Sequence, residues 1–297
     1  MISQKVGVYQ HYDIVRKNGQ AYIIGEGEIT NKTINENDKI LTKIANINTA
    51  YPYFEREYLE FCMNYGCIGV SEMRFPPLQH TFSPEPSILI FNEERIDQAA
   101  NEINYFKKII YLHENPDQIQ LPLEVLEEDK HFRSIFSKNA LPDIKEQELK
   151  LYSLNLLNKR QNSFHDLFII NEQGETTVQP YSFSLIGIAY WELSNKIKMK
   201  ERIIKCINCG TYFTSEYPHA KFCDQATSKG KGTFEHKVCE NRYNTRKRRA
   251  RQMHFKAGRS IQDISASMKW PLDEVKEWIE TYSPDGKLRN LTSSKKD

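Results

Sequence analysis

Four cysteines in the last third of the chain have the types and spacing of a metal site. They are Cys206, Cys209, Cys223 and Cys239, separated by two, thirteen and fifteen residues. A Cys-x2-Cys pair lets two thiolates bind one tetrahedral ion from a tight turn, and Gly210 can adopt the positive φ angle that such a turn requires. Four thiolates leave no open coordination position, so the sequence predicts one zinc ion with a structural role.

The second pair of ligands is widely spaced, which leaves the fourth ligand open. The interval between Cys223 and Cys239 contains Ser228-Lys-Gly-Lys-Gly-Thr, a composition typical of a flexible insertion. Cys239 is the first choice for the fourth ligand. His219 and His236 lie nearby in the sequence and are the alternatives.

A run of basic residues follows the last cysteine, and no acidic residue interrupts it between Arg242 and Arg259. Like charges one helical turn apart repel each other, so an unbroken run is expected to have a polyanionic partner. We therefore expect a helix over 240–257 that binds nucleic acid. The predicted contacts are Arg242, Arg246, Lys247, Arg248, Arg249, Arg251, Lys256 and Arg259.

On an ideal helix these cations surround much of the axis. Arg242, Arg246 and Arg249 fall on one face, and Arg248 and Arg251 fall on another. The residues expected to face inward are Tyr243, Ala250 and Met253.

Charge is divided unevenly along the chain. The formal net charge is +2, but residues 196–297 hold 23 Lys and Arg against 12 Asp and Glu, a net of +11. The first 195 residues hold 18 positive and 27 negative side chains, a net of −9. An acidic N-terminal part repels a phosphate backbone, so nucleic acid is expected to meet only the C-terminal third.

The cysteines and the basic run together resemble a known family. The resemblance rests on Arg202-Ile-Ile-Lys-Cys206, Lys221-Phe222-Cys223 and Cys239-Glu-Asn-Arg242 with the cations that follow. Residues 202–251 are similar to the CGNR-type zinc finger that ends bacterial transcription regulators of the ABATE-domain family. The resemblance implies zinc bound by the four cysteines and DNA binding by the finger. The chain departs from the family at Glu240, which replaces a glycine, and in the longer interval before the last cysteine.

Residues 258–279 have the pattern of two short helices joined by a turn, as in a helix-turn-helix. Pro271 suits the first turn of the second helix, while Lys269 stands where a glycine is common. One apolar stripe is expected from Ile261, Ile264 and Met268, and a facing stripe from Leu272, Val275, Trp278 and Ile279.

The second of these helices is acidic, which argues against close contact with phosphates. It carries Asp273, Glu274, Glu277 and Glu280 against one Lys276. Two interpretations therefore stay open for the segment: a DNA-reading helix-turn-helix, or a helical hairpin for packing or partner binding.

The first 197 residues are expected to be rich in helix, with two short β-hairpins. The hairpins are predicted at 6–30, around Asn18-Gly19, and at 167–178. Glu93-Glu94 and Glu127-Glu128-Asp129 are interpreted as solvated helix faces and not as paired catalytic carboxylates. Helices are predicted over 38–49, 52–65, 93–113, 143–158 and 184–197.

These elements predict an α+β fold in three segments. Residues 1–197 are expected to form an α-rich, ABATE-like domain that binds a small ligand or a protein partner. Residues 198–257 form the zinc ribbon and the basic helix, and residues 258–297 form the helix-turn-helix-like tail with a disordered end.

No motif points to a membrane or to catalysis. The longest apolar runs are too short to span a bilayer and no signal peptide is expected, so we predict a cytoplasmic protein without a membrane partner. Cys62 and Cys67 are interpreted as buried core residues. The eight histidines lie outside hydrolase, metalloprotease and phosphate-loop motifs, so no catalytic residue is predicted.

The function predicted from these features is that of a zinc-dependent DNA-binding protein, a bacterial transcriptional regulator. Double-stranded DNA is the first choice of partner. An RNA-binding protein, and an adaptor of phage or toxin origin that binds no nucleic acid, are the alternatives.

Overall fold

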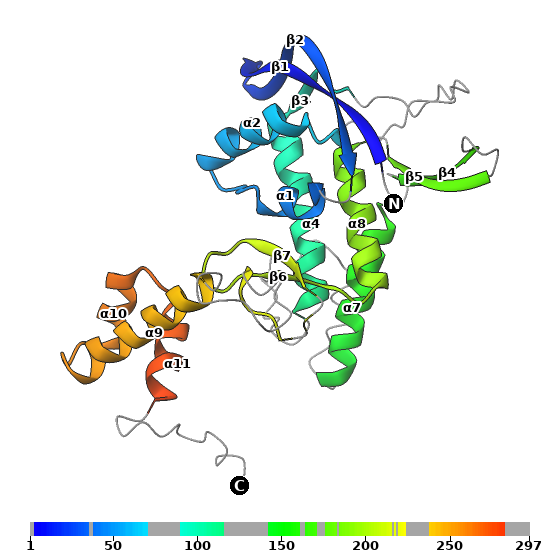
Figure 1. Ribbon diagram of the computed structural model, residues 1–297. Coiled ribbons are helices and arrows are strands. Elements are labelled where there is room, and N and C mark those ends of the chain that lie inside the picture. Colours follow the sequence, from blue (N-terminus) through cyan, green and yellow to red (C-terminus); the bar gives the residue numbers. More distant parts are fainter. Residues whose placement is uncertain are drawn as a thin grey trace. The chain divides into compact units, whose positions relative to one another are not determined.

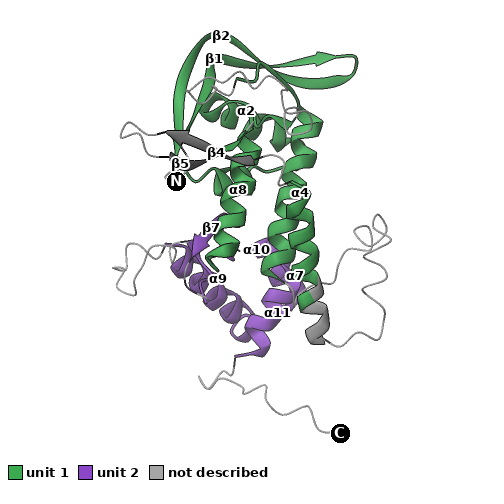
Figure 2. Ribbon diagram, turned by 90° about the vertical axis from the view of Figure 1, so that its right-hand side faces the viewer, with its two compact units in different colours: residues 1–204 green, residues 205–297 purple. Residues whose placement is uncertain are grey.

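The structure is a computed structural model, and it divides the chain into two compact units, Met1–Ile204 and Lys205–Asp297 (Figures 1 and 2). Helices and small sheets are both present, which confirms the α+β prediction. Among the described residues no helix is both long and apolar enough to cross a membrane. The residues described are 3–35, 38–70, 90–115, 142–160, 164–170, 176–182, 184–215, 217, 219–223 and 238–282.

The first unit begins with a long antiparallel hairpin of β1 (Ser3–Lys17) and β2 (Gln20–Asn35). The Asn18-Gly19 turn has φ angles of 51° and 78°, and both are positive as a type I′ turn requires. The short strand β3 (Glu93–Arg95) pairs with residues 22–24, near the start of β2. A separate hairpin consists of β4 (Phe164–Ile170) and β5 (Thr176–Ser182), so both predicted hairpins are present.

Five helices complete the described part of this unit, and each lies within or close to a predicted segment. The long helices α4 and α8 extend away from the β1–β2 hairpin in both ribbon views (Figures 1 and 2). Helix α1 packs on α8, and α4 packs on α7. The five helices are α1 (Ile40–Asn46), α2 (Tyr53–Tyr65), α4 (Ile96–Glu114), α7 (Pro142–Asn158) and α8 (Leu185–Lys198).

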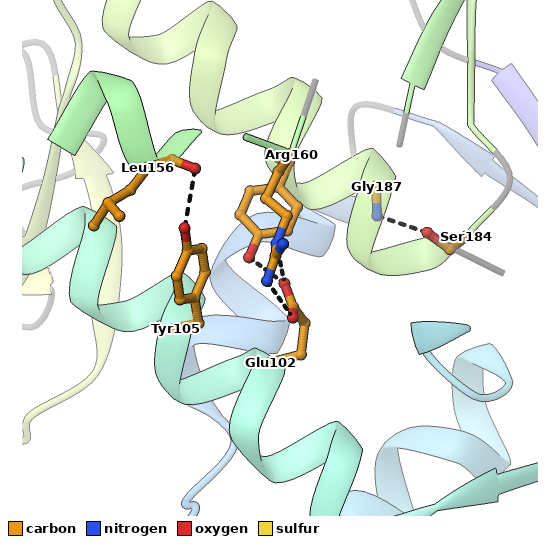
Figure 3. Close-up of polar contacts among 7 residues, drawn as sticks. Glu102, Tyr105, Leu156, Arg160, Ser184 and Gly187 are labelled. Carbon is orange, nitrogen blue, oxygen red and sulfur yellow. Dashed lines mark hydrogen bonds and ion pairs between the residues drawn. The ribbon is translucent and has the colours of Figure 1, made fainter. Parts of the chain in front are cut away.

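A buried carboxylate joins three segments of this core. Glu102 on α4 is only 4% exposed, and both of its oxygens accept from Arg160, at 2.9 and 3.0 Å (Figure 3). The Tyr190 hydroxyl on α8 donates to the same carboxylate at 2.6 Å. Tyr105 adds a hydrogen bond to the Leu156 carbonyl on α7 at 3.2 Å. These bonds compensate the cost of burying a negative charge and fix α4 against its neighbours.

The prediction that Glu93-Glu94 is a solvated helix face is wrong. The two residues lie in β3, where successive side chains point to opposite sides of the sheet. Glu93 is exposed and pairs with Lys17, whereas Glu94 is buried and accepts from the amides of Ile68 and Val70 at 3.0 and 2.6 Å. Burial raises the pKa of Glu94, although these hydrogen bonds oppose the shift.

Cys62 and Cys67 are both fully buried in the first unit, which agrees with their interpretation as core residues. A hydrogen bond with Cys62, together with burial, raises the pKa of Cys67. The predicted acidic run at 127–129 lies outside the described residues, as does the end of the tail.

Removing the Glu102 carboxylate should destabilise the first unit strongly. Glu102→Ala breaks a buried ion pair and leaves polar groups facing the core, which costs about 3 kcal/mol or more. Tyr190→Phe removes one hydroxyl and keeps the ring, so it should cost about 1 kcal/mol. Urea unfolding of both variants measures the difference, and equal unfolding midpoints for the two would contradict this assignment.

Candidate metal centre

The first two cysteines lie in a tight turn between two short strands. β6 (Arg202–Lys205) and β7 (Tyr212–Ser215) form a two-stranded sheet, and Cys206 and Cys209 lie between them. The Gly210 amide donates to the Cys206 carbonyl at 2.8 Å. Gly210 has a φ angle of 75°, which a residue with a Cβ adopts only at a cost. The sulfurs of Cys206 and Cys209 lie within 4.8 Å of each other.

The other two cysteines come from separate segments of the second unit. The Ile207 amide donates to the Lys221 carbonyl at 3.1 Å, which attaches the segment before Cys223 to the turn. Cys239 belongs to the first turn of α9 (Val238–Phe255) and is buried. The basic helix therefore contributes one cysteine of its own to the cluster.

The four sulfur atoms all lie within 4.8 Å of one another and could hold one metal ion. The Cys209 and Cys223 sulfurs are 3.7 Å apart, and the Cys223 and Cys239 sulfurs are 3.5 Å apart. A tetrahedral ion with metal–sulfur bonds of about 2.3 Å separates its sulfurs by about 3.8 Å. His219 is exposed and does not belong to this group, and His236 lies outside the described residues.

The crowded thiols differ in acidity. Burial raises the pKa of Cys223 and of Cys239, and hydrogen bonds with neighbouring thiols raise that of Cys223 further. At Cys209 burial also raises the pKa, but hydrogen bonds with Thr211 and with neighbouring thiols outweigh it and lower the pKa to about 7. A bound cation favours the thiolate form at all four positions, because only thiolates are metal ligands.

After α9 the chain forms two more helices, α10 (Ile261–Met268) and α11 (Leu272–Glu280). Ser260 caps α10 by accepting from the Asp263 amide at 3.1 Å. The turn between the helices places Lys269 in the left-handed conformation that a glycine would adopt more easily. The buried core shared by the three helices is Ala250, Ile264, Val275, Trp278 and Ile279.

This shared core places the predicted boundary between residues 257 and 258 inside one compact unit. The predicted inward residues of α9 are found there, with Ala250 buried and Tyr243 and Met253 packed against the core. The assignment of Leu272 to the facing stripe is wrong, because this first residue of α11 is 44% exposed. The first buried residue of α11 is Val275, about one turn later.

Tyr243 connects the metal site to the helical core. Its ring centroid lies 5.3 Å from that of Phe222, next to a metal-site cysteine, and 5.3 Å from that of Trp278 on α11. The Tyr243 hydroxyl accepts from the Trp278 indole nitrogen at 2.9 Å. Trp270, in the turn between α10 and α11, packs against the rings of Tyr243 and Trp278. Tyr243 therefore contributes to fixing the rotation of α9 about its axis.

Three of the eight predicted contact residues, Arg246, Lys247 and Arg251, are partly buried against the rest of the second unit. Arg246, predicted on one face with Arg242 and Arg249, instead donates to the Asn208 side chain at 2.8 Å and stacks over the Trp270 ring at 4.7 Å. Arg251 donates to the Trp278 carbonyl at 2.8 Å and lies 4.4 Å from the Tyr282 ring centroid.

Lys247 is half-buried, and burial lowers its pKa, as does the charge of Arg251. The other predicted contacts are exposed: Arg242, Arg248, Arg249, Lys256 and Arg259.

Four acidic residues of this unit lie on α11, while α9 carries Glu240 in its first turn and α10 carries Asp263. Asp273, Glu277 and Glu280 are exposed on α11. Glu274 is half-buried and accepts from the Trp270 indole nitrogen at 2.8 Å. The buried side of α11 faces α9 and α10, so its free side is the acidic one.

The orientation of Arg246 by Asn208 and Trp270 could not be predicted from the sequence. Asn208 occupies a variable position of the Cys-x2-Cys step, and Trp270 lies 24 residues beyond Arg246 in a turn. Neither position belongs to a periodic pattern, so only the folded chain reveals these interactions.

Comparisons of the chain with protein-family models, curated proteins and solved structures gave no match. The resemblance of residues 202–251 to the CGNR-type finger therefore stays a prediction.

The purified protein should contain one tightly bound metal ion per chain. Cys209→Ser should lower the affinity for that ion by more than about 100-fold, because even outer-sphere partners of a metal contribute 10- to 100-fold. Cys62→Ala, which removes a thiol outside the cluster, should leave the affinity unchanged. Elemental analysis and chelator competition measure both, and a metal-free wild-type protein would refute the assignment.

Proposed function

We propose that the chain is a DNA-binding protein with a structural zinc ion, and that it acts as a bacterial transcriptional regulator. The observation that carries the proposal is the outward face of α9, which is exposed and bears cations without any acidic residue. This face consists of Arg242, Thr245, Arg248, Arg249, Gln252 and Lys256.

Zinc is the ion that suits the cluster best. Thiolates are soft ligands, and a tetrahedral site of four cysteines is typical of zinc or of an iron–sulfur centre. The sulfur separations of 3.5 and 3.7 Å match a single tetrahedral ion. With all four positions taken by protein, the ion supplies folding energy to the module and no catalysis. Such a site requires reduced thiols, so we place the protein in the cytoplasm.

A polyanion is a better partner for the cationic face of α9 than the surface of another protein. Four cations on one side of a rigid helix would repel each other in water, and neutralisation by phosphates relieves that repulsion. The exposed acids of α11 disfavour a second phosphate contact there, so α11 is proposed as a packing element. The first unit, with its net negative charge, is proposed to bind a small ligand or a protein partner.

Replacing three exposed arginines together should weaken binding to all duplex sequences. Arg242→Ala, Arg248→Ala and Arg249→Ala remove up to three phosphate contacts, so the slope of log affinity against log salt should become shallower by about 3. Fluorescence anisotropy with a labelled duplex at several salt concentrations measures this slope.

A matched control removes the same charge from the first unit. Lys5, Lys159 and Lys198 are exposed cations there, and their replacement by alanine changes the net charge equally. This control should keep the wild-type affinity and slope. Equal behaviour of the two triple variants would remove α9 from the interface, and failure of the wild-type chain to bind duplex DNA would refute the proposed function.

A further inference from the structure

The outward face of α9 contains two uncharged polar residues that the proposed phosphate contacts do not use. Thr245 and Gln252 are both exposed and stand seven residues apart, which is about two turns of helix. They therefore lie on one line along the helix surface. Neither side chain contributes to the buried core that the three helices share.

Arginines flank this line on both sides. At about 100° per residue, Arg248 lies about 60° to one side of Thr245 and Arg249 about 40° to the other. Arg242 lies on the same side as Arg249, and Lys256 lies near the line itself. The face thus has a polar centre between two cationic margins.

The rotation of α9 that presents this face is fixed by the protein. Cys239 belongs to the metal cluster, Tyr243 packs between Phe222 and Trp278, and Arg246 donates to Asn208. All of these interactions lie on the inner side of the helix. The polar line cannot turn away from a bound ligand without breaking them.

These dimensions match the major groove of B-form DNA. The face from Arg242 to Lys256 is about 21 Å long, and a helix with its side chains is about 10–12 Å across. The major groove is about 12 Å wide and is bounded by a phosphate strand on each side. A helix lying in it would bring its margins to the two strands and its centre to the base edges.

The two central residues have the chemistry of base readers. A glutamine amide can both accept from N6 and donate to N7 of adenine, and a threonine offers a hydroxyl together with a methyl group that can contact the thymine methyl. The deep, narrow major groove of duplex RNA does not admit such a helix. The face is therefore shaped for DNA rather than for duplex RNA.

We propose that α9 is a major-groove reading helix in which Thr245 and Gln252 determine base preference, while Arg248 and Arg249 contact the two flanking phosphate strands. This inference rests on the proposed function and adds to it the groove, the residues and the division of their roles. The metal site and the aromatic cluster act on specificity by fixing the rotation of the helix.

The test is a selection by the full-length chain from a pool of short duplexes of random sequence. Wild-type protein should enrich a motif, and Thr245→Ala with Gln252→Ala should reduce the preference for that motif by roughly 5- to 150-fold for each base that is no longer read. The affinity for the unselected pool and its salt slope should stay unchanged. Because both residues are exposed and alanine favours helix, the double variant should remain folded.

Two further variants separate reading from phosphate binding. Gln252→Glu should shift the preferred base from adenine toward cytosine, because a carboxylate accepts from the cytosine amino group. Arg248→Ala with Arg249→Ala should instead weaken binding to every duplex and flatten the salt slope by about 2.

The outcomes distinguish the reading role of α9 from the DNA binding on which it rests. Absence of binding to any duplex would overturn both. Binding without an enriched motif, an unchanged preference in the Thr245 and Gln252 variants, or equal affinity for duplex RNA of the same sequence would overturn the reading role and leave DNA binding intact.

Discussion

The packing of Tyr243 between Phe222 and Trp278 is the interaction on which the organisation of the second unit depends. Helix α9 has 18 residues, yet only Cys239 and Ala250 are buried, so it gains little from apolar burial of its own. Its cations also repel each other along the helix. The helix needs attachments that do not rely on a wide apolar stripe, and the structure supplies three: Cys239 in the cysteine cluster, the aromatic contacts of Tyr243, and the hydrogen bonds of Arg246 and Arg251. The same attachments decide which cations remain free for a partner.

In the first unit some charged side chains are buried and paired, whereas the cations on the outward face of α9 are exposed. Two buried acids of the first unit accept hydrogen bonds from within it: Glu102 from Arg160 and Tyr190, and Glu94 from the backbone amides of Ile68 and Val70. These carboxylates hold separate segments of the unit together. Residues 1–195 nevertheless keep a net charge of −9, which repels other anions. The two units thus differ in the sign of their charge.

Much of this arrangement could be predicted because it is encoded locally. The Asn18-Gly19 turn, the helices and the Cys-x2-Cys-Gly step each depend on neighbouring residues, and those elements were found where they were expected. The structure goes beyond the sequence where a side chain's direction depends on distant contacts. Glu94 is buried because three residues of β3 pair with β2, and Arg246 turns inward because Asn208 and Trp270 lie beside it. A charge pattern identifies a basic helix, but only its packing shows which cations face outward.

The most direct measurement of the role of α9 is cross-linking of the full-length protein to a duplex carrying photoreactive bases, with the attachment sites mapped by mass spectrometry. We expect attachment within residues 241–256 of α9 for bases exposed in the major groove, and none on the acidic helix α11. Attachment confined to residues 272–280 or to the first unit, or no attachment at all, would contradict this role.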